Sequence, residues 1–145
     1  MKKFNFTLQK VLDYKQNLQV DEKNKLAVMR AKYNEMEEQL SLLKSKAEKI
    51  GKEYLEQCNN GMKAGGIQPM LTYIDTLQEQ IKAQIKKMQD YWAEIDKQVD
   101  VLKLINRDVK TLEKLKEKSL EAYQKDQSKA EELFIEEFVI NNTLS

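Results

Sequence analysis

The chain has 145 residues, enough for a single domain, and 34% of them are charged while 41% are hydrophobic. Its four glycines and one proline are too few for a loop-rich globule, and this composition is typical of coiled coils and long helices. The net charge is only +1, so no overall field directs the chain toward nucleic acid or an anionic membrane, and we expect neither as a partner.

The first residues are basic, but no apolar run of signal-peptide length follows them. No other apolar stretch approaches the length needed to cross a bilayer, so we expect no direct membrane insertion. We therefore expect the protein to be made and kept in the cytosol.

Apolar residues in the first part of the chain recur in alternating steps of three and four. The unbroken part of this row is Leu26, Met29, Tyr33, Met36, Leu40, Leu43, Ala47, Ile50 and Tyr54. Such a heptad row predicts a coiled-coil seam, the line of side chains along which two helices pack. Upstream the row continues as Phe4, Leu8, Val11 and Leu18. Lys15 and Glu22 interrupt it, and its phase slips near Leu26 as a stutter would make it do. We expect a helix over about residues 4–58.

Three of the four glycines and the only proline lie between Gly61 and Pro69. This cluster separates two helical rows, and it predicts a turn over about residues 59–68. Pro69 fits the first turn of the next helix, where its missing N–H is no loss.

A second heptad row follows the turn. It comprises Ile74, Leu77, Ile81, Ile85, Met88, Trp92, Ile95, Val99, Leu102, Ile105, Val109 and Leu112. Leu120 and Tyr123 extend this row toward Phe134 and Phe138, and we expect a helix over about residues 69–139. The predicted fold is therefore all-α: residues 1–145 form one domain in which two long helices make an antiparallel coiled-coil hairpin.

The two rows match in a register centred on Gly65 and Gly66, which is the register that the predicted turn dictates. In this register Met36 faces Ile95, and Phe4 faces about residue 127. The second helix then extends beyond the first by about a dozen residues.

The residue types needed for catalysis or metal binding are scarce. The chain has no histidine, and its single cysteine, Cys58, excludes an intrachain disulfide and a cysteine metal cluster. The glycines at 61–66 lack the Gly-Lys-Ser/Thr ending of a phosphate loop. The basic run from Lys110 to Lys118 contains Glu113 and Glu117, so it is not a nucleic-acid stripe. We expect no enzyme, no cofactor and no metal site.

The end of the second helix combines acidic and apolar side chains. The acidic residues are Glu131, Glu132, Glu136 and Glu137, and the apolar ones are Leu133, Phe134, Ile135 and Phe138. This pattern is either a solvated helix end or a partner-binding end, since exposed phenylalanines are unusual unless something covers them.

Three blocks of the sequence resemble the flagellar type III export protein FliJ family. They are residues 4–15 (FNFTLQKVLDYK), residues 73–84 (YIDTLQEQIKAQ), and residues 107–137, which contain LEKLKEK and run into AEELFIEEF. Their order and placement cover almost the whole chain. In the last block the family often has Glu-Gln-Lys before Asp-Glu, whereas this chain has Glu131-Glu132-Leu133 and Glu136-Glu137.

The resemblance implies a non-enzymatic, two-helix coiled coil similar to the central stalk of rotary ATPases. Such a protein inserts into the hexameric ring of the flagellar export ATPase and promotes ring assembly and activity. It also binds the cytoplasmic domain of the membrane export gate and handles export chaperones. Its implied location is cytoplasmic, peripheral at the cytoplasmic face of the inner membrane at the flagellar base.

The resemblance also assigns binding residues. The positions that match the family's gate-binding surface are Gln39, Leu43, Ile50, Tyr73 and Leu77. Lys46, Gln80 and Gln84 occupy neighbouring positions. By analogy with a rotary stalk, the residues expected to reach into the ATPase ring are Phe4, Phe6, Phe134 and Phe138.

Other functions remain open from the sequence. A virulence-type secretion stalk protein shares the same fold. A general, prefoldin-like co-chaperone is a further alternative, although prefoldin-type hairpins carry strands between their helices, and residues 59–68 are too short and too rich in glycine for them.

Overall fold

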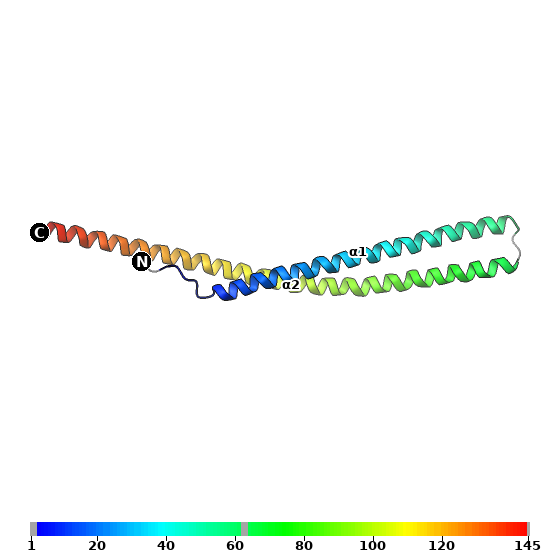
Figure 1. Cartoon of the computed structure of the whole chain (residues 1–145), viewed down its shortest axis with the longest axis horizontal. Coiled ribbons are helices and arrows are strands. Elements are labelled where there is room, and N and C mark those ends of the chain that lie inside the picture. The colour runs from blue at the N-terminus through cyan, green and yellow to red at the C-terminus, as the bar shows by residue number, and fades with distance from the viewer. Residues whose placement is uncertain (1–2, 62–63, 145) are drawn as a thin grey trace. The chain divides into compact units, whose positions relative to one another are not determined.

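Two long helices make up nearly all of the computed structural model, which describes residues 3–61 and 64–144 (Figure 1). Helix α1 spans Gln9–Asn59 and helix α2 spans Ala64–Leu144. No strand occurs in these two described ranges. The all-α fold, with two long helices packed against each other, is therefore confirmed.

Both helices pass through two compact units. One unit comprises Met1–Glu22 and Val101–Ser145, and the other comprises Lys23–Asp100. Within each unit the helices run antiparallel, because contacts pair later residues of α1 with earlier residues of α2. The first unit has a core of four buried side chains, Phe6, Leu12, Ile105 and Val109, against which Phe4, Leu18 and Leu112 pack.

The segment before α1 is not helical, although we expected the helix to begin near Phe4. Phe6 is buried, and the Phe4 ring lies 5.5 Å from the ring of Tyr123, centroid to centroid. The N–H of Gln9 donates to the carbonyl of Phe6 at 3.0 Å, where the chain turns into the helix. In this non-helical segment both phenylalanines contact α2, since Phe6 packs in the cluster with Ile105 and Val109 and Phe4 packs on Tyr123.

The turn is shorter than the glycine cluster suggests. Gly61 has a φ of 73°, and its N–H donates to the carbonyl of Cys58 at 3.3 Å, so this one residue supplies the left-handed conformation that ends α1. Residues 62 and 63 of the predicted turn lie outside the described ranges. Helix α2 begins at Ala64, five residues earlier than predicted, and includes Gly65, Gly66 and Pro69. Pro69 therefore lies beyond the first turn and leaves the carbonyl of Gly65 without its helical donor.

The row of seam residues in α1 is more regular than predicted. None of the nine residues from Leu26 to Tyr54 in the predicted row is exposed, so that part is confirmed. Upstream, the structure buries Leu12 and leaves Leu8 and Val11 exposed, contrary to the prediction. The steps of three and four then continue without a phase slip through Lys15, Gln19 and Glu22 to Leu26. Because Lys15, Gln19 and Glu22 are polar, the pattern of apolar residues alone does not show this continuity.

The same effect changes the seam of α2. Gln84, Tyr91 and Gln98 occupy seam positions, whereas Ile85 and Trp92, which we predicted there, are exposed. The predicted row and the observed row differ by single residues, and both have nearly heptad spacing. Strict alternation of steps of three and four from Leu77 to Leu102 places Gln84 and Tyr91 between the helices. The adjacent apolar residues, Ile85 and Trp92, therefore lie outside the seam.

The predicted register is wrong by about one heptad. Gln84 Nε2 donates to the carbonyl of Met36 at 3.0 Å, so Met36 lies beside Gln84 and not beside Ile95. Similarly, Lys15 pairs with Asp108, eight residues before position 116, which the predicted register places opposite it. Phe4, in the segment before α1, packs against Tyr123 and not near residue 127. A shift of seven residues keeps both apolar rows in the seam, so the rows alone do not distinguish the two registers. The early end of α1 at Gly61 decides between them.

Candidate functional site

The five residues assigned to the gate differ widely in exposure. Gln39 is exposed, and its Oε1 accepts a hydrogen bond from Gln84 Nε2 at 3.4 Å. Tyr73 is also exposed, whereas Leu43 and Ile50 are half-buried in the seam. Leu77 is buried between the helices. Gln39 and Tyr73 are therefore the two of these five residues on the exposed surface, whereas Leu77 contributes to packing between the helices.

A shallow groove lies in the unit that comprises Lys23–Asp100. Its volume is about 410 Å³, and its lining residues are Tyr33, Leu40, Ile85, Met88, Gln89 and Trp92. Trp92 is 51% exposed, and its ring lies 5.1 Å from that of Tyr33. Sequence analysis missed this surface because it assigned Trp92 to the seam, the position that Tyr91 occupies.

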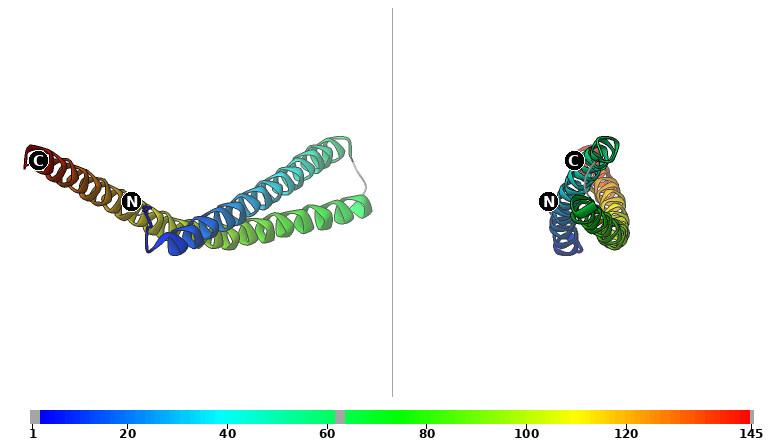
Figure 2. Two further views of the ribbon diagram at one scale, coloured as in Figure 1. Left: turned by 60° about the vertical axis from the view of Figure 1, so that its left-hand side comes forward. Right: turned by 90° about the vertical axis from the view of Figure 1, so that its right-hand side faces the viewer.

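The four phenylalanines assigned to the ATPase ring do not form one surface. Phe6 is in the core and Phe4 is half-buried against Tyr123, whereas Phe134 is 70% exposed and Phe138 is 58% exposed. Every residue from 128 to 143, here named the C-terminal segment, is exposed. This segment runs past the N-terminal residues with no part of α1 beside it (Figure 2).

A second groove lies on α2, beginning at Tyr123, the residue on which Phe4 packs. Its volume is about 790 Å³, and its lining residues are Tyr123, Asp126, Gln127, Ala130, Glu131, Phe134 and Ile135. The groove lies on the same side of α2 that packs against α1 earlier in the helix. Among the residues predicted for the ring, Phe134 is thus the one that borders a concave apolar surface.

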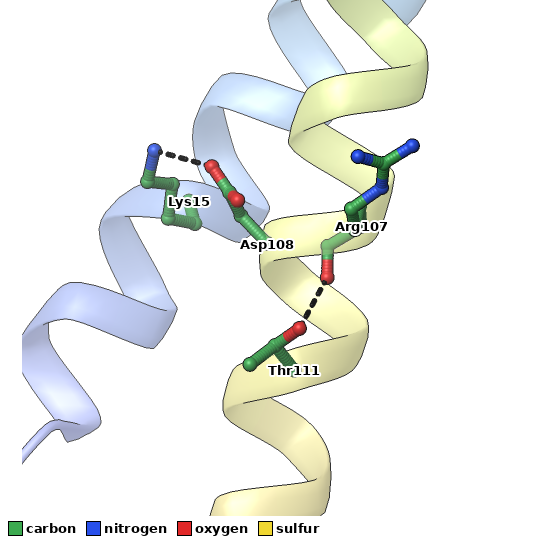
Figure 3. Close-up of polar contacts among 4 residues, drawn as sticks. All are labelled: Lys15, Arg107, Asp108 and Thr111. Atoms are coloured by element: carbon green, nitrogen blue, oxygen red, sulfur yellow. Dashed lines mark hydrogen bonds and ion pairs between the residues drawn. The ribbon is translucent and has the colours of Figure 1, made fainter.

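Four basic residues line one side of α2 in the first unit: Lys103, Arg107, Lys110 and Lys114. All four are exposed, and their spacing of four, three and four residues forms a basic row along the helix. Arg107 points away from α1, while the neighbouring Asp108 carboxylate meets Lys15 Nζ at 2.9 Å (Figure 3). Of the two acidic residues within the run from Lys110 to Lys118, Glu113 lies to the side of the row, whereas Glu117 follows Lys114 on the row itself by three residues. The expectation that this run is not a nucleic-acid stripe stays a prediction.

The described residues contain no candidate metal centre. No group of three or more histidine, cysteine, aspartate or glutamate side chains is arranged to hold a metal ion in this part of the chain. A hydrogen bond with the Cys58 side chain raises the pKa of Tyr54, and both lie near the end of α1. Neither described helix is long and apolar enough to span a bilayer.

Comparison with known proteins gives one match. The family model described as "Flagellar FliJ protein" matches residues 4–144, which include both helices and the turn. Searches of the curated proteins and of the solved structures found no match.

Proposed function

Because the chain belongs to the flagellar FliJ protein family, a family of the flagellar protein export system, we propose that it is a non-enzymatic, stalk-like component of that system. In this role it links three partners: the hexameric export ATPase, the cytoplasmic domain of the export gate, and the export chaperones. Its proposed place is peripheral, at the cytoplasmic face of the inner membrane at the flagellar base. The match over nearly the whole chain supports the proposal.

The observation that favours ring insertion is the C-terminal segment of α2. Leu133, Phe134 and Ile135 are consecutive and exposed, and consecutive residues of a helix point about 100° apart. No single flat surface can cover all three side chains. Apolar side chains on several sides of a helix need a partner that contacts more than one side, as the lumen of a ring would.

Phe4 and Phe6 take a different part in this proposal from Phe134 and Phe138. Since Phe6 is buried and Phe4 packs on Tyr123, they hold the N-terminal segment against α2 just before the C-terminal segment begins. We assign the direct ring contacts to Phe134 and Phe138. Aromatic anchors of this kind commonly supply most of the binding energy of an interface.

The gate is assigned to the other end of the two helices. Gln39 and Tyr73 are exposed there, and the edges of Leu43 and Ile50 remain accessible. Leu77 supports this surface from the seam. Chaperone binding follows from family membership, and we assign no residues to it.

Two alternatives use the same fold. A virulence-type secretion stalk is disfavoured because the matching family is flagellar. A prefoldin-like co-chaperone needs strands between its helices, but only residues 60–63 separate α1 from α2. We therefore prefer the flagellar proposal to both alternatives.

The test compares variants of the two assigned surfaces. The double variant Phe134→Ala, Phe138→Ala should reduce stimulation of ATP hydrolysis by the export ATPase while leaving helicity unchanged. Tyr73→Ala should keep that stimulation and weaken recovery of the gate domain in a pull-down. Val28→Ala, an exposed site on α1, serves as the matched control. If Tyr73→Ala abolished stimulation and the double variant did not, the two ends would be assigned to the wrong partners.

A further inference from the structure

The charge along one side of α2 changes sign between Val101 and the C-terminal segment. Lys103 and Arg107 lie on this side at one end, and Glu132 and Glu136 lie on it at the other. The two pairs share a side because Glu132 follows Lys103 by 29 positions, which is close to eight full helical turns. All four side chains are exposed, and none makes an ion pair within the described residues.

A row of exposed apolar residues runs beside this charged side. It comprises Leu104, Leu115, Ala122 and Leu133. Their spacings of 11, 7 and 11 residues correspond to about three, two and three turns, so the row stays on one side of the helix. The spacings read the same in both directions, as a surface that pairs with itself requires.

We propose that two copies of this chain pair through these rows, with the two α2 helices antiparallel about a twofold axis near residue 119. In this register Lys103 lies opposite Glu136 and Arg107 lies opposite Glu132. The apolar rows match as well, since Leu104 meets Leu133 and Leu115 meets Ala122. Every pair occurs twice because the interface is isologous.

Charge complementarity selects this arrangement over a parallel one. Parallel pairing would place Lys103 beside Lys103 and Glu136 beside Glu136, and like charges at an interface oppose association. The antiparallel register has two unfavourable pairs, Lys110 with Lys129 and Lys114 with Lys125. Three favourable pairs outnumber them: Lys103 with Glu136, Arg107 with Glu132 and Lys118 with Glu121.

The inference goes beyond the proposed function and does not rest on it. The paired region includes Leu133 and Glu136, in the segment that we propose enters the ATPase ring. Pairing and ring entry would therefore compete for the C-terminal segment. The dimer would cover the exposed apolar residues of a chain that has no ring to occupy.

The experiment exchanges the charges of the two ends. One variant carries K103E and R107E, and the other carries E132K and E136K. We expect the unmodified full chain to form dimers in the micromolar range at low salt, measured by sedimentation equilibrium, and each variant alone to dissociate at least about tenfold more readily. An equimolar mixture of the two variants should recover the mass of a dimer, because opposite charges then face each other at both ends.

Controls separate this effect from misfolding and from general charge effects. The variant K44E, K49E changes two exposed lysines of α1 outside the proposed interface and should dimerise like the unmodified chain. Circular dichroism checks that all variants remain helical, and added salt should weaken the dimer by screening. A monomeric unmodified chain would overturn the proposal, as would variants that dimerise normally or a mixture that stays monomeric.

Discussion

Leu12 is 2% exposed, whereas the adjacent Val11 is 43% exposed. Leu12 packs in the same cluster as Ile105 and Val109 of α2, while Val11 lies outside it. The neighbouring seam positions are polar: Lys15 pairs with Asp108, and Gln19 Nε2 donates to Asn106 Oδ1 at 2.6 Å. Single polar pairs in a seam can specify register, because a heptad shift would separate them. Leu12 thus supplies apolar burial where its neighbours supply specificity.

Alanine substitutions at these two positions should therefore have very different effects. Leu12→Ala should lower the free energy of unfolding by about 2–5 kcal/mol, because it removes buried methyl groups and leaves a cavity. Val11→Ala should change it by less than about 1 kcal/mol, since the side chain is largely hydrated already. Urea unfolding followed by circular dichroism measures both values. Equal losses at the two sites would place Val11 in the seam, as the apolar pattern alone suggests.

At the scale of the elements, the ends of the helices depend on glycines with different conformations. Gly61 adopts the left-handed conformation that closes α1, whereas Gly65 lies inside α2. An added Cβ would meet no atom within 4 Å at either position. Backbone conformation alone therefore distinguishes the two sites.

The same substitution should have opposite signs at the two glycines. Gly61→Ala should destabilise the chain by about 1 kcal/mol, because an L-residue resists the left-handed conformation. Gly65→Ala should stabilise it by about 0.5–1 kcal/mol, because alanine is a better helix former. Thermal unfolding of the two variants in parallel provides the comparison. A stabilising Gly61→Ala would mean that α1 does not end at this residue.

At the scale of the whole molecule, the chain divides into residues that fold it and residues left for partners. The buried hydrophobic side chains extend from Phe6 to Val109, and no residue from 128 to 143 is even half-buried. The C-terminal segment nevertheless contains two of the four phenylalanines. Apolar residues that contribute nothing to intrachain packing remain available for a partner.

Truncation separates these two parts. Deletion of residues 128–145 should change the free energy of unfolding by less than about 0.5 kcal/mol, because residues 128–143, which make up nearly all of the deleted segment, are exposed. The same deletion should abolish stimulation of the export ATPase and leave binding to the gate domain intact. Calorimetry, ATP hydrolysis and a pull-down measure these three properties. A large loss of stability would show that the segment packs against the rest of the chain.

The sequence by itself determined the all-α fold, the presence of a turn within residues 59–68, and the seam from Leu26 to Tyr54. It could do so because apolar heptads and glycine conformations are local properties of the chain. It also placed exposed phenylalanines at the end of the second helix. The resemblance to the FliJ family in residues 4–15, 73–84 and 107–137 anticipated the family match.

Only the tertiary structure decided which residues meet across the seam. Steps of three and four can be traced through Ile85 and Trp92 or through Gln84 and Tyr91, and packing against α1 selects the second path. The register predicted from the turn centred on Gly65 and Gly66 was wrong for the same reason, because a seven-residue shift preserves every apolar position. The placement of Phe4 and Phe6 against α2, ahead of α1, also depends on contacts with residues more than ninety positions away, such as Ile105 and Tyr123. No local pattern encodes such contacts, because their free energy exists only when the two helices are together.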